Sequence, residues 1–137
     1  PVASRAMEQG FPPDTISTDL HKLSILGSKA DMPNCISKLM LLGMTLPDAI
    51  ERSTVNPAKA IGKYPELGTL GEGKGADIAV LRMRSGVYSF RDALNKKRMG
   101  RQKLECMLTV RDGRIVWDHD GIAFPDWQKA GNYQVLP

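Results

Sequence analysis

The sequence is poor in the residue types from which small metal sites and disulfide frameworks are built. Its 137 residues include two cysteines and two histidines. Cys35 and Cys106 lie far apart, and neither belongs to a Cys-x-x-Cys pair. This spacing excludes a structural zinc knuckle and favours two free thiols in a reducing compartment. We therefore expect a cytoplasmic protein without disulfides.

Long apolar runs and aromatic residues are also scarce. The longest apolar run, residues 39–44, is far shorter than the roughly 20 residues that a membrane-crossing helix needs, so we expect no membrane partner. The basic run 96–103 contains no aromatic residue for base stacking. It therefore indicates a solvated loop, and we expect no nucleic-acid partner. The tail residues Phe124, Trp127 and Tyr133 are expected to fold back over the β part of the chain or to pack on a neighbour.

The first 30 residues predict a helix, a strand and a loop. Residues 2–9 have a helix-forming composition, and Gly10 is a suitable helix end. The β-branched residues of segment 15–18 predict a short strand. Residues 20–30 show no apolar period, which is typical of a loop.

Three helix starts follow between residues 31 and 62. Asp31, Thr45 and Asn56 can each cap a helix, and a proline follows each of them within two residues. Apolar residues recur at three- and four-residue steps after Asp31 and Thr45. Residues 31–62 are therefore expected to form helices with faces that pack into a core.

The pattern changes to that of a β structure after residue 62. Glycines punctuate a connector, and segment 76–81 predicts a strand. Segments 107–111 and 114–117 alternate with a period of two on either side of Asp112-Gly113. This dipeptide supplies the two positive-φ positions of a hairpin turn.

Asp19 and His21 stand where the strand signal of segment 15–18 ends. A carboxylate and an imidazole two residues apart at the end of a strand are typical of part of an enzyme site. Two plainer interpretations stay open, because an Asp here can simply form a turn and a loop His can simply be solvated. The other histidine, His119, lies in a polar stretch and is expected on the surface.

The order and spacing of several segments resemble the C-terminal part of the amidohydrolase superfamily. They are Asp19 at a strand end, the helical run Ser-Thr-Val-Asn-Pro-Ala at 53–58, the glycine-rich run and strand at 68–80, and the hairpin at 109–116. Ser-Thr-Asp-Leu-His at 17–21 is most similar to the dihydroorotase-like amidohydrolase/deacetylase group.

This resemblance implies an α/β plus β fold. Residues 1–62 would be the last strand and helices of a (β/α)8 metal-dependent hydrolase barrel. Residues 63–137 would be part of a small composite β-sandwich. Because the sequence starts with Pro1 inside helical text, we expect a fragment whose partner is a missing N-terminal portion of the same protein.

The resemblance also implies the chemistry of the site. Asp19 would be both a metal ligand and the catalytic proton shuttle, and His21 would contact the substrate. The cofactor would be zinc, as one or two divalent ions, and the substrate a small molecule with an amide or ester bond. The family's His-x-His pair, lysine and two further histidines are absent from this sequence, so the isolated chain is expected to be inactive.

A different class of function stays open beside this one. The chain could be a non-catalytic fragment or an interaction or structural module that retains the amidohydrolase sandwich. In either case the helices of a partial barrel would expose apolar faces, which favours a homo-oligomer.

Overall fold

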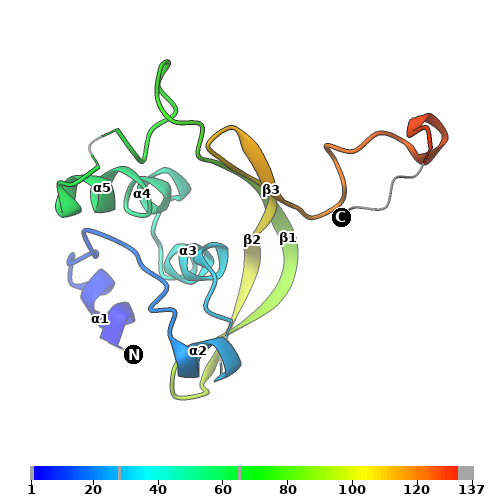
Figure 1. Ribbon diagram of the computed structural model, residues 1–137. Coiled ribbons are helices and arrows are strands. Elements are labelled where there is room, and N and C mark those ends of the chain that lie inside the picture. Colours follow the sequence, from blue (N-terminus) through cyan, green and yellow to red (C-terminus); the bar gives the residue numbers. More distant parts are fainter. Residues whose placement is uncertain (1, 28, 65, 133–137) are drawn as a thin grey trace.

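Helices pack on one face of an antiparallel sheet in this chain (Figure 1). A computed structural model describes residues 2–27, 29–64 and 66–132. The helices are α1 (Val2–Glu8), α2 (Lys22–Gly27), α3 (Met32–Leu41), α4 (Leu46–Glu51) and α5 (Val55–Ile61). The strands are β1 (Ile78–Arg91), β2 (Lys97–Arg111) and β3 (Arg114–Asp118), and a 3-10 turn, η1 (Trp127–Lys129), follows them. None of the helices in these ranges has the length and apolar character needed to cross a bilayer.

Two of the predicted helix caps are confirmed. The backbone N–H of Asn34 donates to Asp31 Oδ1 at 2.7 Å, which starts α3. At the start of α4, Thr45 Oγ1 accepts from the N–H of Asp48 at 3.3 Å. The Thr45 hydroxyl also donates to Asp48 Oδ2 at 2.6 Å, so Thr45 and Asp48 are joined by two hydrogen bonds at the start of the helix.

The predicted cap at Asn56 is wrong. Helix α5 begins at Val55 with Thr54 as its N-cap, and no side chain caps it. Asn56 Nδ2 instead donates to the backbone oxygen of Asp14 at 3.0 Å. The amide is therefore used to tie the N-terminal segment to α5, a long-range contact that the local pattern does not contain.

The strand predicted at segment 15–18 is absent from the described residues, and the chain there is extended without a strand partner. A strand is stabilised by the ladder of an adjacent strand. Here the N–H of Ile16 donates to the backbone oxygen of Arg52 at 2.7 Å, and Arg52 Nη1 donates to the backbone oxygen of Pro13 at 2.6 Å. These hydrogen bonds hold the segment to the end of α4, and the Ile16 side chain is buried.

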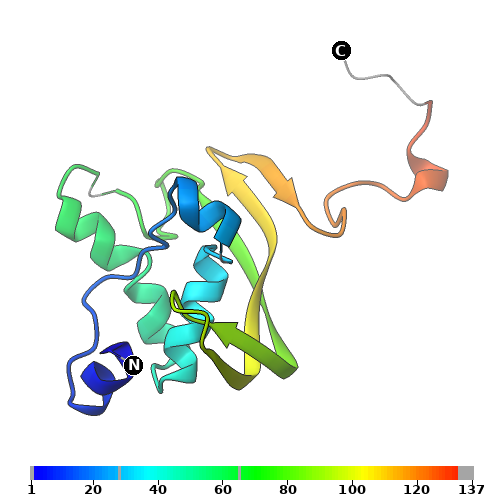
Figure 2. The ribbon, with the colours of Figure 1, turned by 90° about the horizontal axis from the view of Figure 1, so that it is seen from below.

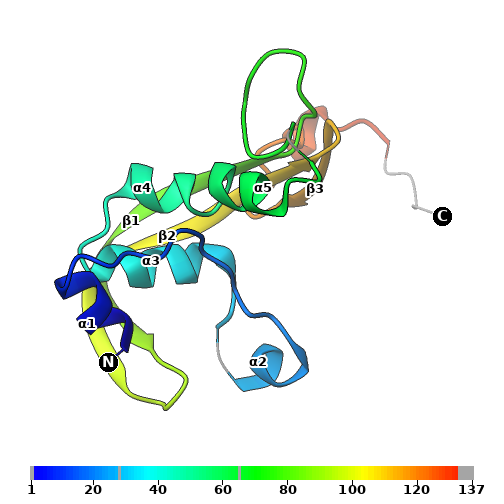
Figure 3. The same cartoon turned by 90° about the vertical axis from the view of Figure 1, so that its left-hand side faces the viewer.

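The loop expected over residues 20–30 is also wrong in part, because α2 occupies six of these residues. A helix of fewer than two turns is too short to display an apolar period. Figure 3 shows this segment, with α2, projecting from the body formed by α3 and the sheet.

The sheet has the order β1-β2-β3, and both pairings are antiparallel. Asp112 and Gly113 have φ values of 48° and 73°, which confirms the predicted hairpin turn. The basic run 96–103 is not a loop, because β2 begins at Lys97 and pairs with the far half of β1. Within this run, Gly100 is buried against Phe90. The run therefore has a buried position as well as exposed basic ones, as a strand on one face of a core does.

A single group of buried side chains joins the helices to the sheet. It comprises Ile16, Ile36, Met44, Ala49 and Leu104. The buried Ser37 hydroxyl, on α3, accepts from the N–H of Leu104 on β2 at 2.9 Å. Figures 2 and 3 show α3, α4 and α5 together on this face of the sheet. The division of the chain at residues 62 and 63 stays a prediction.

The C-terminal tail leaves the body after β3 (Figures 1 and 2). At its start, the Asp118 carboxylate accepts from the N–H groups of Ile122 and Ala123 at 2.9 Å each. Phe124 and Trp127 are 71% and 73% exposed, so the expectation that they fold back over the β part is wrong, and packing on a neighbour stays a prediction. Tyr133 lies outside the described residues.

Candidate functional site

The loop that connects the extended segment to α2 carries both residues of the predicted site. Asp19 has φ 48°, in the left-handed region. Aspartate enters this region more readily than most non-glycine residues. His21 comes two residues later, directly before α2.

The side chains of Asp19 and His21 approach each other across this loop. Asp19 Oδ2 lies 4.0 Å from His21 Nε2, and the two side chains are 92% and 52% exposed. The sequence-predicted pair is therefore brought together, as an open and solvated pair rather than a buried one.

Ser24 is a residue of this loop that the sequence analysis missed. Its hydroxyl accepts from the backbone N–H of His21 at 2.9 Å. It also lies 3.1 Å from the backbone oxygens of both Asp19 and His21, to which it can donate. The signal that could have found it is the spacing His-x-x-Ser, in which a side chain at the third helical position reaches back to the residue before the helix.

The donor atoms of this loop fit a divalent metal in kind but not in number. A carboxylate and an imidazole are both zinc ligands, and a catalytic zinc takes three protein ligands and a water. Within residues 2–27, 29–64 and 66–132, no group of three or more His, Cys, Asp or Glu side chains could hold a metal ion. These residues therefore do not form a metal site by themselves, and Asp19 could supply one ligand of a larger set.

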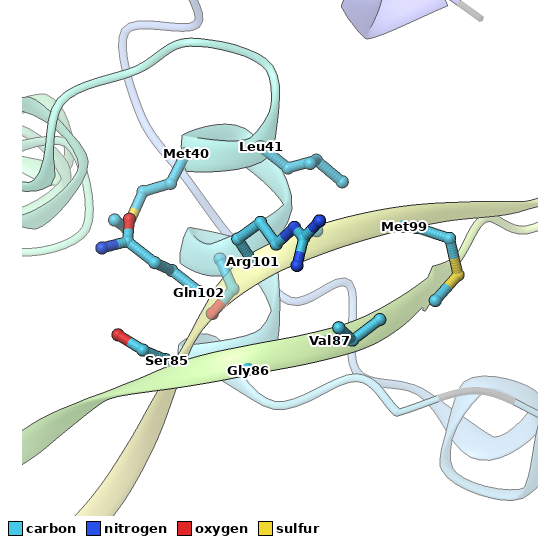
Figure 4. Close-up of a pocket in the computed structure, with 10 residues that line it drawn as sticks. Met40, Leu41, Ser85, Gly86, Val87, Met99, Arg101 and Gln102 are labelled. Carbon is cyan, nitrogen blue, oxygen red and sulfur yellow. The ribbon is translucent and has the colours of Figure 1, made fainter.

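A cavity lies elsewhere, between α3 and the irregular middle of the β1–β2 pairing (Figure 4). It has a volume of about 690 Å3, and Met40, Val87 and Met99 give it an apolar lining. Arg101 is the one ionisable residue that lines it. Ser37 and Ser85 also line it, but among the described residues no histidine or carboxylate that could activate a serine hydroxyl does, so the Asp19 loop remains the candidate site.

A second cavity, of about 560 Å3, lies between α1, residues 13–17, α3 and the tip of the β1–β2 hairpin. Cys35 lines it. Burial raises the pKa of the Cys35 thiol, which keeps it protonated and unreactive. Cys35 and Cys106 are both free, as predicted. Neither Asp19 nor His21 lines either of these two cavities.

Comparison with known proteins relates the chain to several hydrolytic enzymes by sequence. It is 27% identical over 115 residues to a deacetylase of Enterococcus faecalis, covering 83% of this chain and 31% of the relative. It is 38% identical over 79 residues to a deacetylase of Brucella anthropi, covering 58% of this chain and 19% of the relative. An imidazolonepropionase of Maricaulis maris is 49% identical over 41 residues, which are 30% of this chain and 10% of that protein.

The chain is also similar in fold to solved structures of enzymes. The fold is similar to the crystal structure of an adenine deaminase, with a TM-score of 0.79 and 26% identity over 86% of this chain and 32% of that one. A dihydroorotase matches with a TM-score of 0.75 and 27% identity over 84% of this chain and 31% of that one. The chain therefore spans about a third of these structures and of the Enterococcus relative.

A family-level match covers the junction of the helices and the sheet. The sequence profile described as "Amidohydrolase family" matches residues 40–117, which is more than half of the chain. The predicted resemblance is confirmed, and the chain belongs to the amidohydrolase family.

Proposed function

We propose that the chain is the C-terminal part of a metal-dependent amidohydrolase that hydrolyses an amide or ester bond of a small molecule. The observation that carries the proposal is the joint likeness in sequence to deacetylases and in fold to a dihydroorotase. Because the chain spans about a third or less of these proteins, the remaining metal ligands would come from a preceding portion of the same protein.

Asp19 is the residue that we assign to the reaction. When bound, a zinc ion would lower the pKa of a water molecule to about 7. Asp19 would contact the metal and accept a proton from the water as the water oxygen attacks the substrate carbonyl carbon. It would then pass this proton to the departing nitrogen or oxygen as the bond to the carbonyl carbon breaks. The high exposure of Asp19 in this chain leaves its carboxylate open to such partners.

His21 is assigned to the substrate. Its imidazole lies beside the Asp19 carboxylate, in the loop directly before α2, where it could donate a hydrogen bond to a substrate oxygen. Loops commonly carry such contacts on a rigid scaffold.

The test is the activity of the complete protein that contains this chain. An N-acetylated amino acid is the first probe, because two of the relatives are deacetylases. Asp19→Asn should lower kcat by about 10²- to 10⁴-fold, the usual contribution of a general acid–base group. Asp14→Asn removes an exposed carboxylate from the same segment and should leave kcat unchanged. A near-normal rate in Asp19→Asn would remove Asp19 from the mechanism.

A non-catalytic module is the second candidate, and one observation favours it. The described residues contain no group that could hold a metal ion on its own. Zinc content separates the candidates, since a module needs no bound metal in the complete protein, whereas an amidohydrolase of this kind retains at least one ion.

Two further properties belong to the proposal. The free thiols Cys35 and Cys106 favour a reducing compartment such as the cytoplasm. Exposed apolar side chains such as Val2, Leu70 and Ile61 favour packing against the rest of the protein or a second copy.

A further inference from the structure

The hydroxyl of Ser24 lies at the centre of the loop that carries Asp19 and His21. It accepts the backbone N–H of His21 at 2.9 Å, and its single proton is shared between the backbone oxygens of Asp19 and His21, both at 3.1 Å. The N–H of Ile25 donates to the same His21 oxygen at 3.1 Å. One side chain thus connects the two residues assigned to the site with the first turn of α2.

Asp19 needs such a connection because of its backbone conformation. Few non-glycine residues adopt the left-handed region, because the Cβ atom there lies close to the following carbonyl oxygen. Asp19 has φ 48°, and its own carbonyl oxygen is the one that Ser24 contacts. The hydrogen bond therefore acts directly on the strained residue.

The Asp19 side chain has little packing to hold it. It is 92% exposed, whereas Ser24 is half-buried. With so little packing, the direction of an exposed side chain depends mainly on the backbone that carries it. The backbone of this loop is held by Ser24 and by the start of α2.

We infer that Ser24 is a positioning residue that keeps the Asp19 carboxylate in place for the proposed reaction and His21 beside it. This inference rests on the proposed function, since positioning matters only if Asp19 contacts the metal and the reacting water. Ser24 itself touches neither substrate nor metal, and it acts through the backbone of the two residues that do.

The test compares Ser24→Ala, Ser24→Thr and the wild type in the complete protein. Loss of a group that orients a metal ligand typically costs about 10- to 100-fold in activity or metal affinity. We expect Ser24→Ala to lower kcat for an N-acetylated amino acid by about that factor, with KM little changed. It should also release zinc faster to a chelator. Ser24→Thr retains the hydroxyl and should restore most of both quantities.

Control variants separate this inference from the proposed function. Ser17→Ala removes an exposed hydroxyl two residues before Asp19 and should match the wild type. If Asp19→Asn is inactive while Ser24→Ala keeps wild-type kcat and zinc retention, Ser24 has no positioning role and the proposed function stands. If Ser24→Ala and Ser24→Thr lose activity equally and both unfold at a lower temperature, Ser24 is merely structural. A fully active Asp19→Asn overturns both assignments.

Discussion

At the residue scale, the backbone conformation of Asp19 decides how its carboxylate is presented. Segment 17–21 places a carboxylate and an imidazole two residues apart in the sequence, and in the structure Asp19 Oδ2 lies 4.0 Å from His21 Nε2. The left-handed conformation of Asp19 and its link to Ser24 could not be predicted. Both depend on the path of a loop whose hydrogen bonds run to a side chain of α2.

Gly68 and Gly73 allow a controlled test of a close backbone contact. Their φ values are nearly equal, at 79° and 77°, so alanine loses about 1–2 kcal/mol of conformational energy at either site. A Cβ at Gly68 would lie 2.6 Å from the backbone oxygen of Thr54, whereas nothing lies within 4 Å at Gly73. We predict that Gly68→Ala lowers the free energy of unfolding by about 1–3 kcal/mol more than Gly73→Ala.

Urea denaturation of the two variants measures this difference. Equal losses of stability in the two variants would show that the backbone of Gly68 does not pack closely against Thr54 at the start of α5.

At the element scale, the features predicted from the sequence are those fixed by neighbouring residues. The caps at Asp31 and Thr45 and the turn at Asp112-Gly113 each involve atoms within three or four residues. The predicted strand at 15–18 failed because strand formation depends on a partner strand, which local sequence does not specify. The prediction of a loop at 96–103 failed because the pairing of β2 with β1 joins residues far apart in the sequence.

The candidate site shows the same limit. Asp19 and His21 could be proposed from their spacing and from the order of the motifs around them. Ser24 was missed because its partners are backbone atoms, which every residue has, and the spacing His-x-x-Ser is a weak local signal for such contacts.

The pairing of β1 with β2 includes a pH-dependent contact. Arg84 Nε donates to Glu105 Oε2 at 2.8 Å, and this hydrogen bond lowers the pKa of Glu105. Because the pKa of Glu105 is lower in the folded state than in the unfolded state, the ionised carboxylate stabilises the fold at pH values above the ordinary glutamate pKa of about 4.3. That stabilisation is lost as the pH falls through the lower, folded-state value.

We therefore predict that Glu105→Gln lowers the Tm at pH 7 by at most a few degrees and that the difference from wild type narrows at pH 3. The effect is small because the partners lie at the surface, and 1 M salt should reduce it further. Glu72→Gln, in the exposed connector, serves as the control. A difference in Tm that is the same at pH 7 and pH 3 would exclude this ion pair as its source.

At the scale of the whole molecule, the chain is a substantial part of an amidohydrolase fold. Its helices and sheet share one buried core through Ile36 and Leu104, and about 85% of the chain matches the solved deaminase and dihydroorotase structures. Those structures are about three times as long. Many large apolar side chains, Ile25 and Leu94 among them, are exposed here. A larger protein would cover such side chains.

The most direct test of this view is to measure zinc content and hydrolysis of an N-acetylated amino acid on two samples, the complete protein and the 137-residue chain. We predict at least one zinc ion per complete protein and measurable turnover. The 137-residue chain, with Asp19 and His21 as its candidate ligands, should retain almost no zinc and hydrolyse nothing. Stoichiometric zinc and turnover in the 137-residue chain, or a complete protein without either, would contradict the proposed function.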